Sequence, residues 1–504
     1  MDKRIISLAA GIPLIASIGM GCQENKEQPL PNIIFIFADD QGPLDFGVMN
    51  PEVHTPHLDQ LAKNGTLFTQ AYNQGSFTPA VCVASRAMLI TGTYLWKAAE
   101  YSDSGRNRNG NTPAEMPEYS VPRTEPSWYW PLEMKAAGYD TYFTGKWHIN
   151  VPADELFDHV GTVRGGMPSQ SEERYNRRFI EGEPDTWHPW DSIFGGYWEG
   201  GTHWSEVIYD ETSDFLQLSS ESKNPFFMYI AFNAPHDPRQ SPKEFVDMYP
   251  VDEILVPPNF LPIYPYAEEI GSGQRLRDER LAPFPRTEYA VRRNRQEFYA
   301  IISHMDYQIG RIMEELKRTG QDKNTYIIFT ADHGLAVGDH GFMGKQNMYD
   351  ASMKVPLIIS GPEVKKNRRN DQLVYFQDIV PTTLEIAGIP KPQYVDYHSF
   401  LPLASGKEDK STYDAVYGAY MGTQRMIRNE KYKMLIYPVA NVVRLYDMEN
   451  DPFEIHDLAS DLKYKPVMDE LFIEFKKLQT EVSDPLDITP YYQNFFFELS
   501  SKSE

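Results

Sequence analysis

The sequence predicts an α/β sandwich in which helices cover both faces of a large, mostly parallel or mixed sheet, with a smaller α+β subdomain at the C-terminal end. Apolar runs without polar alternation indicate strands buried on both faces, as in sheets covered by helices. These runs are 33–38, 226–232, 326–331 and 355–359. Helical patterns that stop near a glycine lie between them, at 57–63, 130–137 and 296–317. Strands that alternate with helices favour a mostly parallel sheet.

The smaller subdomain is predicted over 411–500, after a main domain of 31–405 and a charged hinge at 406–410. β-rich runs at close spacing predict a short antiparallel sheet. They are 415–420, 424–428, 432–437 and 442–446, and a helical pattern follows at 465–482. The segment 161–201, rich in glycine, tryptophan and charge, predicts long loops around a site.

The first 21 residues predict a secretory signal peptide, because a basic start precedes an apolar run at 5–20. The position of Cys22 resembles that of the lipid-attachment cysteine of bacterial lipoproteins, although Gly19 replaces the usual leucine. Residues 22–30 would then form a tether. Ordinary cleavage with a plain spacer cysteine is the alternative. We therefore expect an exported bacterial protein, periplasmic or anchored to the outer membrane only through a lipid on Cys22.

Charge and cysteine content exclude two classes of protein. The 504 residues include 71 acidic and 48 basic side chains, a formal net charge of −23. This balance argues against nucleic-acid binding, which depends on a basic face. It leaves room for an anionic substrate, because a small site can be locally positive. Two cysteines, Cys22 and Cys82, are too few for a disulfide framework.

Cys82 lies where a turn leads into a short predicted helix. A lone cysteine is most often a buried structural residue. The alternative is a nucleophilic thiolate that is activated by the N-terminus of the helix. The segment Cys-Val-Ala-Ser-Arg at 82–86, with Leu-Ile-Thr-Gly at 89–92, resembles the signature of the formylglycine-dependent type I sulfatases. Ala84 stands where proline is commonest. The resemblance implies an alkaline phosphatase-like fold and a maturation enzyme that converts Cys82 to formylglycine, whose hydrate is the nucleophile.

Acidic residues follow two of the predicted strands, as Asp39-Asp40 and Asp332-His333. Crowded carboxylates raise one another's pKa, and a hard divalent cation relieves the repulsion, which favours Ca²⁺. Because an imidazole is an unusual ligand for Ca²⁺, His333 keeps another divalent metal open as an alternative. The segments 32–41 and 330–334 resemble the metal motifs of the sulfatases. The resemblance implies one cation per chain, held by these four residues and Cys82.

Basic residues and histidines complete the predicted site. Lys146 and His148 are two apart on an extended segment and therefore share a face. The resemblance implies that Lys146 and Lys345 bind the sulfate and that Arg86 adds positive charge. It implies that His148 assists release of sulfate from the formylglycine and that His236 protonates the leaving alcohol.

The resemblance implies a sulfuric ester hydrolase that attacks sulfur, with Asp332 as the base. We expect sulfated carbohydrates, such as glycosaminoglycan fragments, as substrates and no nucleic-acid partner. A choline-sulfate-like small ester, a phosphoesterase of the same superfamily and a non-catalytic glycan-binding lipoprotein are the alternatives. His188, His203 and the tryptophans between 187 and 204 either line a sugar subsite or pack the loops.

Overall fold

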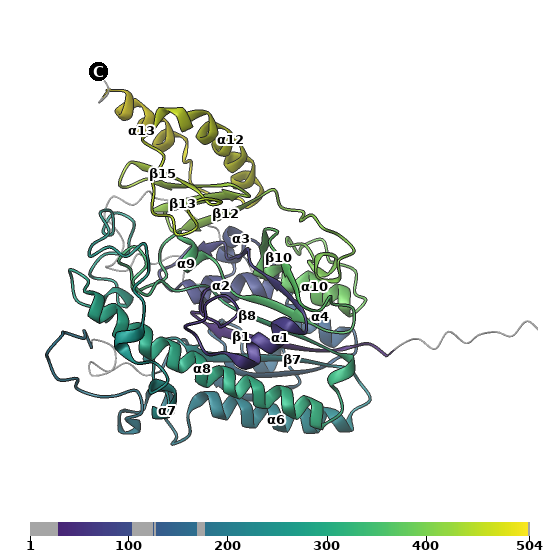
Figure 1. The fold of residues 1–504 in the computed structure, drawn as a ribbon. Coiled ribbons are helices and arrows are strands. Elements are labelled where there is room, and N and C mark those ends of the chain that lie inside the picture. Colours follow the sequence, from purple (N-terminus) through teal and green to yellow (C-terminus); the bar gives the residue numbers. More distant parts are fainter. Residues whose placement is uncertain (1–28, 103–123, 125, 127, 169–176, 502–504) are drawn as a thin grey trace, which may run out of the picture. The chain divides into compact units, whose positions relative to one another are not determined.

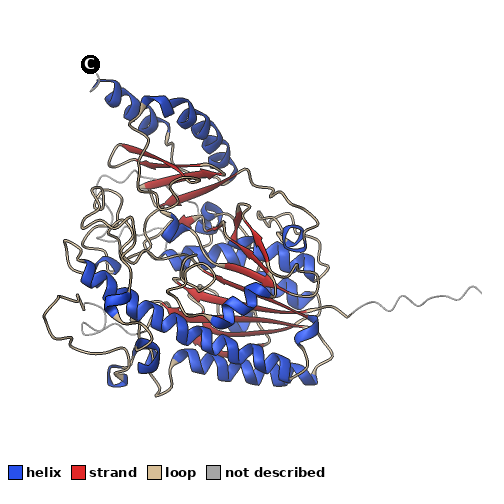
Figure 2. Cartoon of the chain, in the orientation of Figure 1, coloured by secondary structure: helices blue, strands red, loops and turns tan. Residues whose placement is uncertain are grey.

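A large mixed sheet forms the centre of the fold. In the computed structural model its eight strands run in the order β10-β2-β9-β8-β1-β7-β5-β6 (Figures 1 and 2). Their bounds are β10 Arg368–Asn370, β2 Thr66–Phe68, β9 Leu357–Ser360, β8 Thr325–Ala331, β1 Asn32–Asp39, β7 Phe226–Pro235, β5 Asp140–Lys146 and β6 His159–Arg164. The strands from β8 to β6 pair in parallel, and β9 is antiparallel to both β8 and β2. The predicted α/β class with a mostly parallel, mixed sheet is confirmed.

The structure describes residues 29–102, 124, 126, 128–168 and 177–501. The predicted signal peptide, the lipid site at Cys22 and most of the predicted tether lie outside these residues. Among the helices of the described part, none has the length and apolar character that crossing a membrane requires.

Helices cover both faces of the central sheet, as buried strands require. On one face α6 (Trp204–Glu221), α8 (Glu288–Arg318) and α1 (Pro56–Lys63) pack together against the strands (Figure 1). On the other face, aromatic rings of β1 meet α4 (Trp130–Ala136) and the segment before α10 (Ile379–Ile386). The ring centroids of Phe35 and Trp130 are 5.4 Å apart, and those of Phe37 and Phe376 are 6.0 Å apart.

Two of the helices on the central sheet, α8 and α6, differ from the sequence prediction. Helix α8 begins at Glu288 rather than at 296, because the Thr287 side chain accepts a hydrogen bond from the Ala290 backbone N–H and caps the helix. Helix α6 was not predicted. Its buried stripe includes Ser205, Thr212 and Ser219, so the apolar periodicity that signals a helix is weak there.

A second sheet of five strands lies in the C-terminal part of the chain (Figure 2). Four antiparallel strands follow the predicted runs: β12 Ala415–Tyr420, β13 Gln424–Asn429, β14 Tyr432–Tyr437 and β15 Val442–Asp447. Helix α12 (Lys465–Glu481) packs on β12 and β13, and α13 (Thr489–Ser501), which was not predicted, packs on β14 and β15. The fifth strand is β4 (Gly75–Ser76), which pairs in parallel with β12. An early segment just before Cys82 therefore belongs to the C-terminal sheet.

The remaining α-helices and strands of the described part are short and connect or flank the two sheets. They are β3 Ala71–Tyr72 and β11 Val374–Tyr375, which pair with each other, and α2 Val81–Thr91, α3 Leu95–Glu100, α7 Lys243–Val246, α9 Asp350–Met353 and α11 Leu401–Ser405.

The β4–β12 pairing leaves no space for a side chain at Gly75. A Cβ atom there would lie 2.0 Å from the Ala419 carbonyl oxygen, and φ is +88°. Gly138 has φ +90° but nothing within 4 Å of the same position. We expect Gly138→Ala to lower the free energy of unfolding by about 1–2 kcal/mol through backbone strain. Gly75→Ala should cost about 2 kcal/mol more, because it adds a backbone clash. Urea denaturation measures both, and equal losses would contradict the pairing.

Candidate active site

The first part of the site is built by two neighbouring strand ends. Strands β1 and β8 pair in parallel with Ala38 opposite Ala331, so their carboxyl ends coincide. Asp39 and Asp40 end one strand, and Asp332 and His333 follow the other. The Asp40 backbone N–H donates a hydrogen bond to Asp332 Oδ1 at 3.2 Å, which ties the two ends together. Ligand sites in such sheets form beyond these ends.

Cys82 lies in the first turn of α2 and is buried among these residues. Its sulfur is 3.1 Å from Lys345 Nζ, 3.3 Å from His333 Nε2 and 3.8 Å from Asp40 Oδ1. The ligand-type atoms of all five predicted metal residues, including Asp39 and Asp332, lie within 4.8 Å of one another. The structure therefore brings together the whole predicted ligand set.

Arg86 lies one turn after Cys82 on the same helix and is fully buried. Its Nε donates to Asp332 Oδ2 at 3.2 Å and its Nη1 to the Lys146 carbonyl oxygen at 2.9 Å. Burial acts to lower the pKa of Arg86, but the charges of Asp332 and Asp39 outweigh it and raise this pKa. Arg86 thus joins α2, β5 and the end of β8 as a permanent cation.

Two lysines pair with the other two carboxylates. The Lys146 ammonium forms a buried ion pair with Asp39, and Lys345 Nζ lies 2.6 and 2.8 Å from the two oxygens of Asp40. Burial, and then the charge of Asp332, raise the pKa of Asp39 well above its usual value. For Asp40, burial is outweighed by the neighbouring cationic groups, and the pKa is lowered. The site is therefore a buried set of alternating charges.

The two predicted catalytic histidines occupy different places. His236, just after β7, has Nδ1 2.8 Å from the Asp237 carbonyl oxygen and Nε2 3.6 Å from Asp40 Oδ2. Its pKa is well below the usual value, mainly because it is buried. Within the described ranges, His148 makes no hydrogen bond to the cluster. Burial, and then the charge of Lys146, lower the pKa of His148 to about 3.

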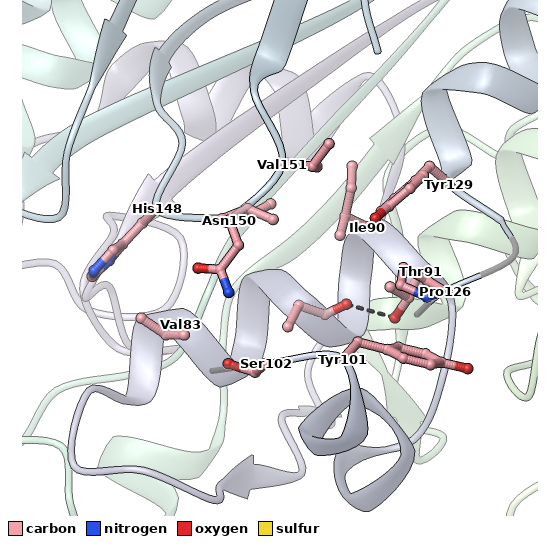
Figure 3. A pocket seen from close by; sticks show the side chains of 12 residues that line it. Val83, Ile90, Thr91, Tyr101, Ser102, Pro126, Tyr129, His148, Asn150 and Val151 are labelled. Atoms are coloured by element: carbon pink, nitrogen blue, oxygen red, sulfur yellow. Dashed lines mark hydrogen bonds between the residues drawn. The ribbon is translucent and has the colours of Figure 1, made fainter. Parts of the chain in front are cut away.

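His148 lines a pocket of about 400 Å³ that adjoins the start of α2 (Figure 3). Val83, which follows Cys82, forms part of the same wall, together with Tyr101 and Asn150. Of the ten predicted catalytic and metal residues, the structure therefore joins nine, Cys82 among them, in one connected cluster, and the tenth, His148, borders the neighbouring pocket.

Sequence reasoning missed the groups that hold Asp332 in place. The Asn73 side-chain amide and the Ser85 hydroxyl, the latter at 2.6 Å, donate to the Asp332 carbonyl oxygen. Asn73 is distant in sequence and carries no motif, so only the fold reveals its contact. Ser85 lies inside the segment 82–86, so its position next to Arg86 could have indicated from the sequence that it belongs to the site.

Several histidine and tryptophan side chains of the segment 187–204, for which the sequence allows either a sugar subsite or loop packing, pack into the fold. His203 is buried and stacks on Tyr197 with centroids 5.2 Å apart. Trp204 is buried beneath the Arg164 guanidinium, 4.1 Å from the ring centroid. Trp187 is also buried. For His203 and Trp204 the loop-packing alternative describes the structure, whereas Trp187 also lines a pocket.

Comparison with known proteins gives the family. The sequence matches the sulfatase family model over residues 31–389, which is most of the chain. The chain belongs to the sulfatase family. It is a sulfuric ester hydrolase with the alkaline phosphatase-like fold, and sulfatases of this family generally use a metal and a formylglycine. A second model, of the C-terminal part of N-sulphoglucosamine sulphohydrolase, matches residues 338–481.

Relatives extend over nearly the whole chain. An arylsulfatase of Clostridium perfringens is 29% identical over 472 residues, covering 88% of this chain and 92% of its own. An ulvan-active sulfatase of Formosa agariphila is 27% identical over 480 residues, covering 88% of this chain and 78% of its own. A structure solved with its substrate D-glucosamine-2-N,6-O-disulfate has a TM-score of 0.68 at 20% identity, covering 90% of this chain and 99% of that one. The predicted family, fold and reaction class are confirmed.

The buried contacts of Arg86 predict a large effect on stability. Arg86→Met leaves the Asp332 carboxylate buried without its cation, so we expect the free energy of unfolding to fall by about 3–5 kcal/mol. The control is Arg369→Met, whose side chain is 59% exposed and pairs with exposed Asp371. That variant should stay within about 0.5 kcal/mol of the parent protein. Guanidinium denaturation in a chelating buffer measures both, and similar losses in the two variants would refute this role for Arg86.

Proposed function

We propose that this sulfatase removes O-sulfate groups from sulfated carbohydrates, glycosaminoglycan fragments among them, through a formylglycine formed from Cys82. The observation that supports the proposal is what surrounds that thiol. Three carboxylates, an imidazole and three basic side chains lie together around it in a buried site. When formed, the formylglycine supplies a hydroxyl as nucleophile toward sulfur.

The proposed metal is Ca²⁺, and the side chains present fit such an ion. Asp39 Oδ1 is buried and accepts no hydrogen bond, so a ligand oxygen stands ready. His333 Nδ1 lies 2.8 Å from the Gly334 carbonyl oxygen, which leaves Nε2 directed at Asp40 Oδ1, 3.0 Å away. Asp39, Asp40, Asp332, His333 and position 82 would hold the ion. Once bound, it would supply positive charge at the carboxylates and at the sulfate.

The basic side chains are placed to bind a sulfate ester. Lys345 Nζ lies 3.1 Å from the Cys82 sulfur, and the Lys146 ammonium is held at the same cluster by Asp39. We propose that both ammonium groups contact the sulfate oxygens, with Arg86 fixed behind them. Because these charges are already positioned and buried, they stabilise the transition state without reorganisation.

His236 is proposed to protonate the leaving alcohol. Its Nδ1 donates to the Asp237 carbonyl oxygen, so Nε2 is the nitrogen that exchanges a proton inside the site. Burial keeps the free histidine neutral, and an anionic ester beside it favours the protonated form. We further propose that His148, which lines the adjoining pocket, assists release of the sulfate.

The carbohydrate assignment is supported by relatives and by the pocket at His148. One relative is named for activity on ulvan, and a structural neighbour was solved with a sulfated glucosamine. The pocket of about 400 Å³ combines apolar Val83 and Ile90 with polar Asn150, a mixture that suits a sugar ring. We also propose export of the protein to the periplasm or outer membrane, with a lipid on Cys22 as the only membrane attachment.

The role of Cys82 predicts complete dependence of turnover on this residue. Protein from a host with a formylglycine-generating enzyme should carry an aldehyde at position 82, detected by mass spectrometry of the peptide. Cys82→Ala should reduce hydrolysis of a sulfated monosaccharide by at least about a thousandfold, because the nucleophile is lost. A phosphate monoester is assayed in parallel. Full activity with an unmodified thiol, or a preference for the phosphate ester, would overturn the proposal.

Removal of the metal should abolish activity and lower thermal stability. Dialysis against a chelator is expected to reduce turnover at least about tenfold, with Ca²⁺ restoring it more fully than Mg²⁺ or Zn²⁺. The melting temperature should rise with added Ca²⁺, since an ion that binds only the folded state stabilises it. Asp39→Asn should lose this rise, whereas Asp371→Asn, an exposed control, should keep it. A Ca²⁺-induced rise that persists in Asp39→Asn would place the ion elsewhere.

A further inference from the structure

A second pocket lies beside the residue that follows His236. Its volume is about 280 Å³, and its wall includes Arg177, Phe179, Trp187, Asp237, Arg239 and Glu297. The side chains come from the loop after β7, from the segment 177–187 and from α8. The roles assigned above use only the backbone carbonyl of Asp237, so this pocket has no function in the proposed chemistry.

Arg239 is the unusual side chain of this wall. It is 4% exposed, and its Nη1 donates to Asn294 Oδ1 at 2.7 Å. Its Nε and Nη2 are buried and have no hydrogen-bond partner. Unsatisfied donors on a buried charged group are costly, so they are normally paired with an acceptor. Two N–H groups of this guanidinium are therefore buried without an acceptor, on a side chain that lines the pocket.

The carboxylates of the wall are already engaged with other cations. Asp237 forms an ion pair with Arg277, and Glu297 forms one with Arg177. Within the described ranges, Arg239 has no ion pair. Burial lowers the pKa of Arg239, and the charge of Asp237 opposes this effect. The pocket thus holds one buried cation without a contacting counterion.

Aromatic rings hold the two arginines of the wall in place. The Arg239 guanidinium lies 5.3 Å from the Phe298 ring centroid. That of Arg177 lies 3.9 Å from the Trp187 ring and 4.5 Å from the Phe179 ring. A stacked guanidinium presents its donors in a fixed plane, which suits bidentate binding of a carboxylate or sulfate.

We propose that the Arg239 pocket binds a second anionic substituent of the saccharide, a carboxylate or a further sulfate, while the scissile sulfate occupies the site at Cys82. The proposal rests on the proposed function. Asp237 connects the two places, because its Oδ1 is 3.3 Å from His236 Nδ1 while its side chain lines the pocket.

The test compares three esters that carry the same scissile sulfate. The first has no other charge, the second has a uronic acid carboxylate on the adjacent sugar, and the third has a second sulfate. Matured wild-type enzyme should show a higher kcat/KM for the second or the third ester. Arg239→Gln should reduce that preference about 10- to 100-fold, the size expected for hydrogen bonds to a charged group.

Two further variants keep the test interpretable. Arg239→Lys keeps the charge but loses the planar donors, and it should lose part of the preference even if Arg239→Gln folds poorly. Arg311→Gln removes a half-buried arginine elsewhere on α8, where it packs on Tyr209, and should leave the preference unchanged. Melting temperatures establish that the compared variants are folded.

The outcomes separate the pocket from the underlying activity. Turnover of the singly charged ester by wild-type enzyme tests the sulfatase proposal alone. If that ester is hydrolysed and Arg239→Gln changes all three esters equally, or none, the pocket proposal is wrong. If no ester is hydrolysed, calorimetric binding of the same saccharides to Cys82→Ala and to Cys82→Ala/Arg239→Gln still tests the pocket. Selective weakening of the carboxylate ester or of the disulfated ester identifies which anion it binds.

Discussion

Three carboxylates are buried together around Cys82, and each has its own cation. Asp39 pairs with Lys146, Asp40 with Lys345 and Asp332 with Arg86. Burying one of these charges alone would carry a large desolvation cost, so the two members of each ion pair have to be buried together. The cations come from β5, from the loop before α9 and from α2. The position of every one of these elements therefore depends on this set of ion pairs.

The register of the sheet determines how the set assembles. Ala38 lies opposite Ala331, and Asp39 lies opposite Pro235, so three strands end at one level. Helix α2 then places Cys82 and Arg86 on the same face, one turn apart. The backbone thus creates a concave group of side chains before any ligand is bound. The neighbouring pockets at His148 and Arg239 lie beside this group, where a substrate larger than the sulfate itself would extend.

Much of this arrangement could be predicted from the sequence. Apolar runs that end in Asp39-Asp40 and Asp332-His333 gave both the strands and their common edge, because buried parallel strands have a clear local pattern. Helix α6 could not be predicted, since serine and threonine occupy part of its buried stripe. Contacts such as that of Asn73 with Asp332, and the unpaired donors of Arg239, depend on residues distant in sequence. They leave no local pattern and emerge only from the packing.

Strand β4 has a consequence for the order in which the molecule is made. Gly75 and Ser76 pair with Ala419 and Tyr420, so the stretch leading to Cys82 is held by a strand from a much later part of the polypeptide. Cys82 itself is 4% exposed. The proposed oxidation of Cys82 would require a maturation enzyme to reach a side chain that the folded chain buries. Under the proposed function, conversion of Cys82 to the aldehyde would therefore have to precede the pairing of β4 with β12, and a chain that folded first would keep a buried thiol at position 82.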